Sequence, residues 1–406
     1  MKRKLLKTIG LSNMTKDIIY LSNALPESLY KKYNLKLSMA SQRFNGLLIG
    51  GLKGKGAVTV YSTSVGDLPT ARVIEEYDGI RYIIIRKGIF NRFWQNIRML
   101  AHITVRSREV VIVSDYLNNV LFNTLFVLIN IIYKIPAAVI VTDLPSFFKI
   151  RSIFDVKIVA WRALSWLVLK GYKKHIFLTK QMNDVVHSKS WIVMEGVVPF
   201  GGDKQVSDNH TKKKVILYAG GIEKEYGVGL LVKSFIKAIH GDYELHVYGD
   251  GSYLGDCKSM ALDNKEVKFF GVVPNSTVVK AEQSAMILVN PRCGSLDFTK
   301  YSFPSKNLEY MCSGTATLCY LLPGMPEEYR DYIIELKSED EAGMISEITK
   351  ALLMSPEKLT EIGHKAKKFV SEYKNSGIQA DRIVHFVCPD EASLSVSNLP
   401  GRGFQW

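Results

Sequence analysis

Short apolar runs rich in β-branched residues alternate with longer helical stretches along the first half of the chain. The runs cover residues 17–23, 57–64, 81–87, 109–115, 137–145 and 175–180. Because they are almost continuously apolar, they are typical of strands buried on both faces, as in a parallel sheet with crossover helices. In such sheets the ligand crevice lies beyond the carboxyl ends of the strands. Ser22, Asp115 and Asp143, which follow three of the runs, are therefore expected near a crevice.

A second alternation begins after a polar, glycine-containing segment at residues 201–214, which we interpret as an interdomain linker. Helices are expected near 228–240 and 275–283, from residue 304 or 305, and over 341–354 and 356–374. A chain of 406 residues is also longer than one core usually organises. The pattern predicts an α/β protein with two Rossmann-like domains facing each other across a cleft. The predicted boundaries are 1–200 for the first domain, 215–388 for the second and 389–406 for a tail.

The most hydrophobic segment, residues 118–141, is interrupted by Asn123, Asn130, Lys134 and Pro136. Its uninterrupted apolar stretches are shorter than the roughly 20 residues that a membrane-spanning helix needs. We therefore predict a buried helix followed by a strand. The first residues carry the cations of a signal peptide without a long apolar run after them, so secretion is not expected.

Composition adds an electrostatic constraint. Lys and Arg number 53 against 39 Asp and Glu, and the net charge of +14 favours an anionic partner such as phosphate, nucleic acid or an acidic membrane. The sequence has no RNA-binding signature and no basic helix spaced for a groove, so nucleic acid is not expected. The five cysteines form no C-x-x-C pair, which favours a reduced, cytoplasmic setting over a disulfide framework or a zinc site.

Residues 290–314 crowd polar groups between an apolar strand and an apolar helix. Pro304 suits the first position of a helix, and Gly314 suits the position after its last turn. The free backbone N–H groups and the dipole at such a helix start favour a phosphate. Ser305 adds a hydroxyl and Lys306 adds a mobile cation.

Two further residues of this segment extend the predicted anion site. Arg292 leaves the preceding strand and could approach the same anion from another side, while Glu309 lies one turn along the helix, where its carboxylate could accept both hydroxyls of a ribose. The alternative interpretation is a capped surface helix with scattered charges. The clustering of Arg292, Lys300 and Lys306 around the helix start favours the anion site.

The segment "NPR…DFTKYSFPSKNLEYMCSGTATLCYLLPGMPEEY" resembles the donor-binding segment of group 1 (family four) retaining glycosyltransferases of the GT-B fold, nearest to the enzymes of bacterial capsule and exopolysaccharide biosynthesis. Residues 216–235 and 245–251 resemble the two glycine turns that open the second domain of that family. The resemblance implies a UDP- or GDP-sugar as donor, no other cofactor, no required metal, and transfer with retention of anomeric configuration. The sequence has no D-x-D motif and no His-rich cluster, which agrees with the expectation that no metal is required.

The resemblance also implies which residues contact the donor. These are Gly220, Gly221, Lys224, Gly249, Arg292, Tyr301, Ser305, Lys306 and Glu309. Tyr301 stands where many relatives carry a glutamate that contacts the donor sugar. The usual Arg and Lys of the first glycine turn are absent, and Lys224 is the only cation nearby. We hypothesise that Arg292 and Lys306 supply the displaced positive charge.

In the first domain, Asp115 falls where the family often has a histidine, and Asp143 follows a strand in a similar way. Both are catalytic candidates that could stabilise positive charge on the sugar, and both could instead be strand-end caps. Gln42, Arg43 and Asn45 are acceptor-side candidates. The alternative for their segment is a helix that simply ends at Gly50 and Gly51.

Residues 147–174 combine Phe, Trp and Leu with several Lys and Arg, a composition suited to an anionic membrane surface, although core packing explains the apolar positions nearly as well. The leading hypothesis is a glycosyltransferase on the cytoplasmic face of the plasma membrane that extends a lipid-linked glycan. The alternatives are a non-catalytic GT-B subunit that binds a partner glycosyltransferase, and a nucleotide-sugar 2-epimerase.

Overall fold

The structure is a computed structural model that describes residues 17–35, 37–65, 68–86, 88–105, 110–114, 116–147, 156–200, 212–239 and 241–389. The chain forms two compact units. Unit 1 comprises Met1–Phe177, Val186–Ile192 and Ser376–Trp406, and unit 2 comprises Leu178–Val185 and Val193–Asn375. Most of the predicted linker, and the predicted tail after residue 389, lie outside the described residues.

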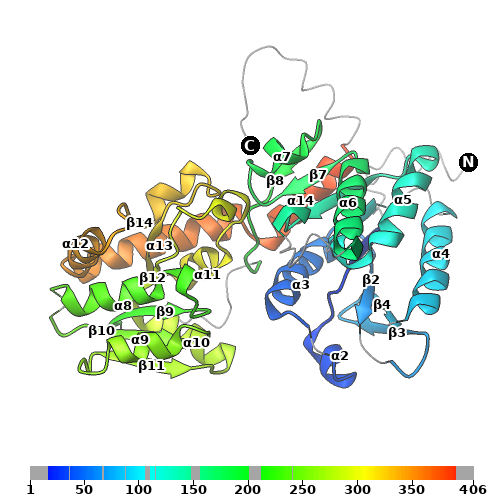
Figure 1. The fold of residues 1–406 in the computed structure, drawn as a ribbon. Coiled ribbons are helices and arrows are strands. Elements are labelled where there is room, and N and C mark those ends of the chain that lie inside the picture. The colour runs from blue at the N-terminus through cyan, green and yellow to red at the C-terminus, as the bar shows by residue number, and fades with distance from the viewer. Residues whose placement is uncertain are drawn as a thin grey trace, which may run out of the picture. The chain divides into compact units, whose positions relative to one another are not determined.

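Unit 1 is built on an eight-stranded sheet in the order β3-β4-β2-β1-β5-β6-β7-β8 (Figure 1). Its strands are β1 (Ile18–Ser22), β2 (Val58–Val65), β3 (Arg72–Tyr77), β4 (Ile80–Arg86), β5 (Val110–Val113), β6 (Ala137–Val141), β7 (His175–Phe177) and β8 (Trp191–Val193). Strands β4, β2, β1, β5, β6 and β7 pair in parallel, as their buried apolar sequences predicted.

Strand β3 is the exception, because it pairs antiparallel with β4 at the edge of the sheet. Asp78 and Gly79 connect the two strands with φ of +50° and +68°. An Asp-Gly pair suits a tight hairpin turn, since both central residues need positive φ. The sequence analysis did not include this hairpin, although its Asp-Gly pair is a signal for it.

Helices cover both faces of the unit 1 sheet (Figure 1). They are α2 (Glu27–Lys32), α3 (Met39–Lys53), α4 (Ile89–Val105), α5 (Val120–Tyr133), α6 (Val156–Gly171) and α14 (Ser376–Val387), with the short α7 (Met182–Val186) and the 3-10 helices η1 (Tyr116–Asn119) and η2 (Pro145–Phe147). Helix α3 packs against α14, and α5 packs against both α4 and α6. The connection from β1 through α3 to β2 runs across the sheet in one direction and those through α4, α5 and α6 run in the other. Because such crossovers are right-handed, α3 lies on the opposite face from α4, α5 and α6.

Helix α3 runs through Gly50 and Gly51 to Lys53, so the alternative that these glycines end the helix is wrong. A Cβ atom on Gly51 would lie 2.1 Å from the backbone oxygen of Ser376, the first residue of α14. The glycine therefore serves close packing between the two helices. Lys55 also pairs with Asp381 of α14 at 2.6 Å.

Residues 376–388 were assigned to the second domain from the sequence, and in the structure α14 belongs to unit 1. The contact of α14 with α3 accounts for this placement. Lys174, which follows α6, adds a hydrogen bond of 2.7 Å from its Nζ to the carbonyl oxygen of Phe386. Unit 1 is therefore assembled from both ends of the chain.

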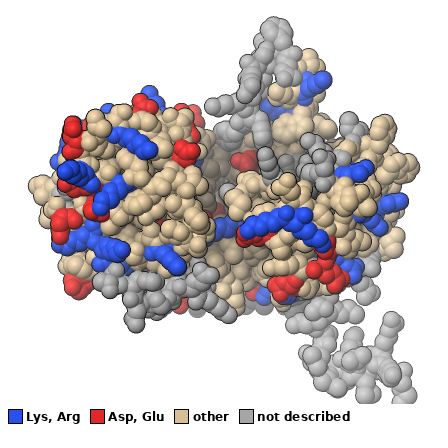
Figure 2. Space-filling model, turned by 90° about the horizontal axis from the view of Figure 1, so that it is seen from below, with Lys and Arg blue, Asp and Glu red and all other residues tan. Residues whose placement is uncertain are grey.

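Unit 2 has a six-stranded, wholly parallel sheet in the order β11-β10-β9-β12-β13-β14. Its strands are β9 (Lys213–Ala219), β10 (Glu244–Tyr248), β11 (Val267–Gly271), β12 (Ala285–Asn290), β13 (Ala316–Tyr320) and β14 (Ile334–Leu336). Its helices are α8 (Val228–Lys237), α9 (Leu254–Met260), α10 (Asn275–Ser284), α11 (Ser305–Ser313), α12 (Glu341–Leu352) and α13 (Pro356–Tyr373), with η3 (Lys224–Tyr226), η4 (Asp297–Tyr301) and η5 (Glu327–Tyr332). The expected helices near 228, 275, 305, 341 and 356 are confirmed. The face of unit 2 in Figure 2 carries interspersed side chains of both charges.

A buried ion pair closes unit 2 where the chain leaves it. The Nζ of Lys374, just after α13, lies 2.9 Å from an oxygen of Glu195 and 2.7 Å from one of Glu328. The side chains of Lys374 and Glu195 are only 7% and 5% exposed. Such a pair costs desolvation energy, and losing one partner leaves an uncompensated buried charge.

Candidate functional site

Two glycine turns of unit 2 lie against each other at the carboxyl ends of β9 and β10. The amide of Gly220 donates to Tyr248 O at 3.0 Å, and the amide of Ile222 donates to Asp250 O at 2.9 Å. Gly249 has a φ of +125°, and a Cβ atom there would lie 1.8 Å from the carbonyl oxygen of Gly220. Only glycine fits this contact, which keeps the backbone of both turns low at the strand ends, where open α/β sheets bind ligands.

The start of helix α8 packs against the end of a third strand, β12, beside the two glycine turns. Gly227 has a φ of +78°, and a Cβ atom on it would lie 2.2 Å from the carbonyl oxygen of Pro291. Pro291 and Arg292 follow β12, which lies next to β9 in the sheet. The glycine turn after β9 therefore packs directly against the segment that carries Arg292.

The guanidinium of Arg292 lies between two aromatic rings. Its carbon is 4.6 Å from the ring centre of Phe298 and 5.7 Å from that of Tyr226, which belongs to the turn after β9. One terminal nitrogen donates to Ser302 Oγ at 3.3 Å, and Nε is buried without a hydrogen-bond partner among the described residues. Burial lowers the pKa of Arg292, but guanidinium groups stay charged at neutral pH. This unfilled donor is suited to an oxyanion such as a phosphate.

Helix α11 begins at Ser305 behind Pro304, as the sequence predicted, and no side chain caps its start. Ser305 is exposed. Tyr310 anchors the helix beneath β9, because its hydroxyl accepts from the amide of Ala219 at 2.9 Å and lies 3.2 Å from the carbonyl oxygen of the same residue. Gly314 ends the helix in the left-handed conformation with a φ of +80°. The open helix start has free N–H groups and a positive dipole end.

Lys306 and Glu309 bind each other in the structure. The Nζ of Lys306 lies 2.7 Å from an oxygen of Glu309, one turn along α11. The sequence analysis assigned these side chains to different parts of a donor, the diphosphate and the ribose. Lys224 is exposed at the start of η3, and Tyr301 is half-buried at the end of η4. Donor roles for all four residues stay predictions.

Among the first-domain candidates, Asp115 lies outside the described residues. Asp143 is exposed just after β6, and its carbonyl oxygen accepts from the hydroxyl of Tyr116 at 3.0 Å. Catalytic roles for Asp115 and Asp143 stay predictions.

The acceptor-side candidates lie on α3, and two of them hold the segment around β1. Gln42 accepts from the amide of Leu25 at 2.8 Å and donates to the carbonyl oxygen of Asn23. Asn45 accepts from the hydroxyl of Tyr20 at 2.6 Å. Both amides are buried, whereas Arg43 is half-buried. These hydrogen bonds give Gln42 and Asn45 a structural role, and contact with an acceptor stays a prediction.

Sequence reasoning missed two serines of unit 1 that lie beside the end of β1. Ser62 on β2 and Ser114 after β5 flank the end of β1, where Ser22 pairs in register with Ser62. The hydroxyls of Ser62 and Ser114 are buried and have no partner among the described residues. The position of Ser114 directly after an apolar strand is a signal for it, whereas Ser62 lies within β2 and has no such signal.

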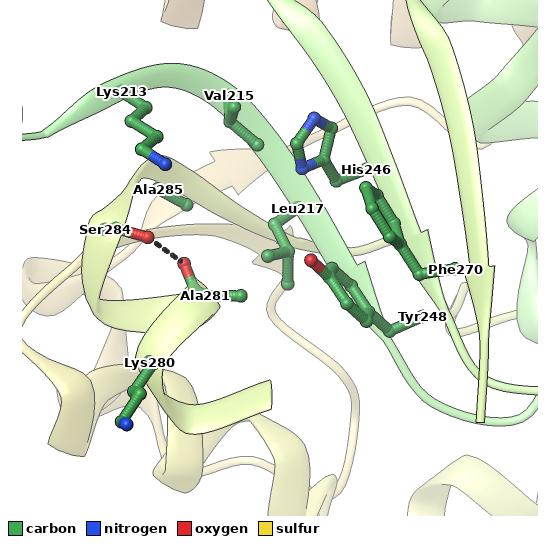
Figure 3. Close-up of a pocket in the computed structure, with 10 residues that line it drawn as sticks. All are labelled: Lys213, Val215, Leu217, His246, Tyr248, Phe270, Lys280, Ala281, Ser284 and Ala285. Atoms are coloured by element: carbon green, nitrogen blue, oxygen red, sulfur yellow. Dashed lines mark hydrogen bonds between the residues drawn. The ribbon is translucent and has the colours of Figure 1, made fainter. Parts of the chain in front are cut away.

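Unit 2 also contains a cavity of about 300 Å³ between α10 and the face of β9, β10 and β11 (Figure 3). Tyr248 and Phe270 lie together on the strand side of the cavity, where their rings stack with centres 4.5 Å apart. None of the predicted donor residues lines this cavity. Its lining residues are Lys213, Val215, Leu217, His246, Tyr248, Phe270, Lys280, Ala281, Ser284 and Ala285.

The described residues contain neither a metal-binding cluster nor a membrane-spanning helix. No group of three or more His, Cys, Asp or Glu side chains in that part of the chain is placed to hold a metal ion. No helix within it has the length and apolarity to cross a membrane.

Comparison with known proteins shows the fold and a family similarity within unit 2. Residues 202–369 match the family described as "Glycosyl transferases group 1". Sucrose-phosphate synthase of Thermosynechococcus elongatus superposes with a TM-score of 0.62 at 11% identity, over 94% of this chain and 100% of that chain. The lipopolysaccharide outer core galactosyltransferase WaaB superposes with a TM-score of 0.58 at 12% identity, over 91% of this chain and 99% of that chain. HepE of Anabaena, solved with UDP and glucose, superposes with a TM-score of 0.59 at 10% identity, over 95% of this chain and 100% of that chain.

These structural likenesses show the GT-B fold, and the family match is a similarity of residues 202–369, most of unit 2, to group 1 glycosyl transferases. No curated protein matches the sequence. The predicted fold class and the group 1 resemblance are thereby confirmed at this level.

Proposed function

We propose that the protein transfers a sugar from a UDP- or GDP-sugar to a lipid-linked glycan in bacterial capsule or exopolysaccharide biosynthesis, with retention of anomeric configuration. The observation that carries the proposal is Arg292, whose buried Nε has no partner among the described residues and whose guanidinium carbon lies 5.7 Å from the ring centre of Tyr226 in the turn after β9. The glycine turns lie at the strand ends where open α/β sheets bind ligands, and HepE of Anabaena was solved with UDP and glucose.

In this proposal the donor residues act on the leaving diphosphate. The acceptor oxygen forms a bond to the anomeric carbon while the bond from that carbon to the diphosphate oxygen breaks. The electron pair leaves with the nucleoside diphosphate, and the acceptor proton passes to it. Arg292, Lys306 and the start of α11 would offset the growing negative charge. Turnover is then expected to persist in excess EDTA.

Donor binding also requires the ion pair on α11 to open. Glu309 would accept the ribose hydroxyls only after it releases Lys306, which would turn to the diphosphate. The cost is small, because partly exposed ion pairs contribute about 0–1 kcal/mol. Asp115 and Asp143 of unit 1 would face the sugar, and the acceptor would bind to unit 1 near Gln42, Arg43 and Asn45.

Binding of nucleotides tests the proposal before the sugar is known. The melting temperature and the calorimetric Kd are measured with UDP and GDP, and with uridine and guanosine as matched controls that lack the diphosphate. One nucleotide is expected to stabilise the protein by about 2.7 kcal/mol at a concentration of 100 Kd. The matching nucleoside is expected to bind at least about tenfold more weakly.

Release of UDP or GDP from a panel of sugar nucleotides then identifies the donor. Slow hydrolysis of one sugar nucleotide is the expected result. If no nucleotide binds and every donor is silent with every acceptor, the protein is a non-catalytic subunit. Interconversion of a sugar nucleotide with its 2-epimer would instead identify an epimerase.

A further inference from the structure

Helix α4 of unit 1 presents an apolar stripe to solvent. Phe90, Phe93, Trp94 and Ile97 follow one another at helical spacing on its outer side, and Phe90 and Trp94 are 84% and 62% exposed. Exposed aromatic residues at i, i+3, i+4 and i+7 form one continuous strip. Single apolar residues scattered over a surface need no explanation, but a continuous apolar strip marks a site of interaction.

The orientation of this helix is fixed by its inner side. Asn96 is buried there, and its amide exchanges hydrogen bonds of 3.1 and 3.4 Å with the side chain of Asn119. Met99 and Leu100 are also buried. Rotating the aromatic residues inward would break the amide pair and expose this inner side. The outward stripe is therefore the stable arrangement of α4.

Helices α5 and α6 continue the apolar surface beside α4 (Figure 1). The expectation that α5 is a buried helix is wrong for its outer side. Buried Asn123 holds the inner side, where it accepts from the hydroxyl of Tyr172 at 2.7 Å and donates to the carbonyl oxygen of Tyr116. The exposed large apolar residues of the two helices are Leu121, Leu128, Ile131, Ile132, Tyr133, Val156, Val159 and Leu167.

The charges on this surface have one sign. Helices α4, α5 and α6 contain no Asp or Glu in their sequences. Arg98, Lys134, Lys157 and Lys170 are exposed on or next to these helices. Two copies of the surface would bring cation against cation, so the charge opposes self-association. Apolar side chains among unopposed cations suit a bilayer with anionic headgroups.

We infer that the outer face of α4, α5 and α6 is the surface by which the protein binds an anionic lipid bilayer, with Phe90 and Trp94 inserted among the headgroups. The sequence analysis placed a membrane-binding segment at 147–174, of which only α6 contributes here. The role of this contact in catalysis rests on the lipid-linked acceptor proposed above. Binding itself requires neither donor nor acceptor.

Vesicle sedimentation tests the inference with the full chain. The probes are phosphatidylcholine vesicles with and without phosphatidylglycerol, at low and high salt. The variant F90S/W94S removes two exposed aromatic residues, and the matched control L262S/L353S removes two apolar residues of unit 2 that are 83% and 72% exposed. A third variant, R98Q/K170Q, removes two cations of the surface.

The partition coefficient on anionic vesicles is expected to fall at least tenfold in F90S/W94S and to stay within twofold in L262S/L353S. R98Q/K170Q is expected to lose most of the difference between low and high salt. Equal binding of wild type and F90S/W94S, or no binding of the wild type, would overturn the inference. So would a concentration-dependent dimer in sedimentation velocity that only F90S/W94S abolishes.

Nucleotide binding measured on the same samples separates this inference from the proposed function. Vesicle binding without any nucleotide binding would support the membrane-binding surface and contradict the proposed transferase function. Nucleotide binding without vesicle binding would contradict the membrane-binding surface and leave the proposed function standing. An unchanged far-ultraviolet circular dichroism spectrum and an unchanged urea unfolding midpoint in F90S/W94S would show that the variant is folded.

Discussion

Replacement of Arg292 separates a donor-binding role from a structural one. The variant R292M keeps an unbranched apolar stem and removes the guanidinium, with its charge and its contacts with the rings of Phe298 and Tyr226. R292K keeps the charge but loses the planar fork that can hold two oxygens of a diphosphate. The two variants therefore distinguish charge from geometry.

The expected effects follow from the contacts of the guanidinium. A hydrogen bond to a charged group is worth about 1.5–3 kcal/mol, so losing two to a diphosphate in R292M weakens nucleotide binding by about 3–6 kcal/mol. At 1.4 kcal/mol per factor of ten, this is a loss of about 10²–10⁴ in Kd. R292K, which loses one such bond, is expected to lose about 10–100-fold.

The free energy of unfolding of R292M is expected to rise slightly or to stay unchanged. Burial lowers the pKa of Arg292, which shows that its charge is held at a desolvation cost. The stacking on two rings offsets part of that cost by about 0.5–1 kcal/mol each. The free energy of unfolding of R292M is therefore expected to stay within about 1 kcal/mol of wild type.

Calorimetric titration with UDP and GDP, together with urea unfolding, measures both quantities. R330M is the matched control, because Arg330 is an exposed arginine of unit 2 paired with Glu327 and Glu335. Its nucleotide affinity should remain within about twofold of wild type. Wild-type affinity in R292M would refute the reasoning, and a loss of more than about 2 kcal/mol in unfolding free energy would make Arg292 a structural residue.

Two further predictions concern the stability of unit 2. K374M should lower the free energy of unfolding in urea by about 3–5 kcal/mol, because Glu195 is left as a buried, unpaired carboxylate. The double variant K374M/E195Q should recover most of this loss. Equal losses in K374M and K374M/E195Q would contradict the prediction. Burial lowers the pKa of Lys212 to about 8, so the unfolded state binds more protons between pH 8 and 10.5. Unfolding free energy should therefore rise there by up to about 1.4 kcal/mol per pH unit relative to K212M, and parallel pH profiles of the two proteins would exclude it.

Five helices of unit 2 were predictable because each is signalled locally, whereas the short α9 and β14 were not predicted. Pro304 and Gly314 mark both ends of α11, and an apolar run marks each of the buried parallel strands. The glycine turns were identified through the resemblance to the family, but their purpose depends on contacts across the sheet. The closeness of Gly249 to Gly220 and of Gly227 to Pro291 depends on how neighbouring strands end, which no local pattern encodes.

The remaining features depend on contacts between residues distant in sequence. Gly51 was expected to end a helix because its partner, Ser376, lies more than 300 residues away. The outward side of α4 was not predictable for a similar reason, since Asn96 decides the rotation of the helix through Asn119. Burial of a helix face is a property of the assembled unit.

The placement of α14 has a consequence for the order in which the protein folds as it is synthesised. A ribosome has made all of unit 2 before it reaches Ser376, so that unit can form its sheet on the nascent chain. Unit 1 is begun first and finished last, because α3 remains uncovered until α14 emerges. A stop codon before residue 376 would therefore spare the residues of unit 2 and leave unit 1 incomplete.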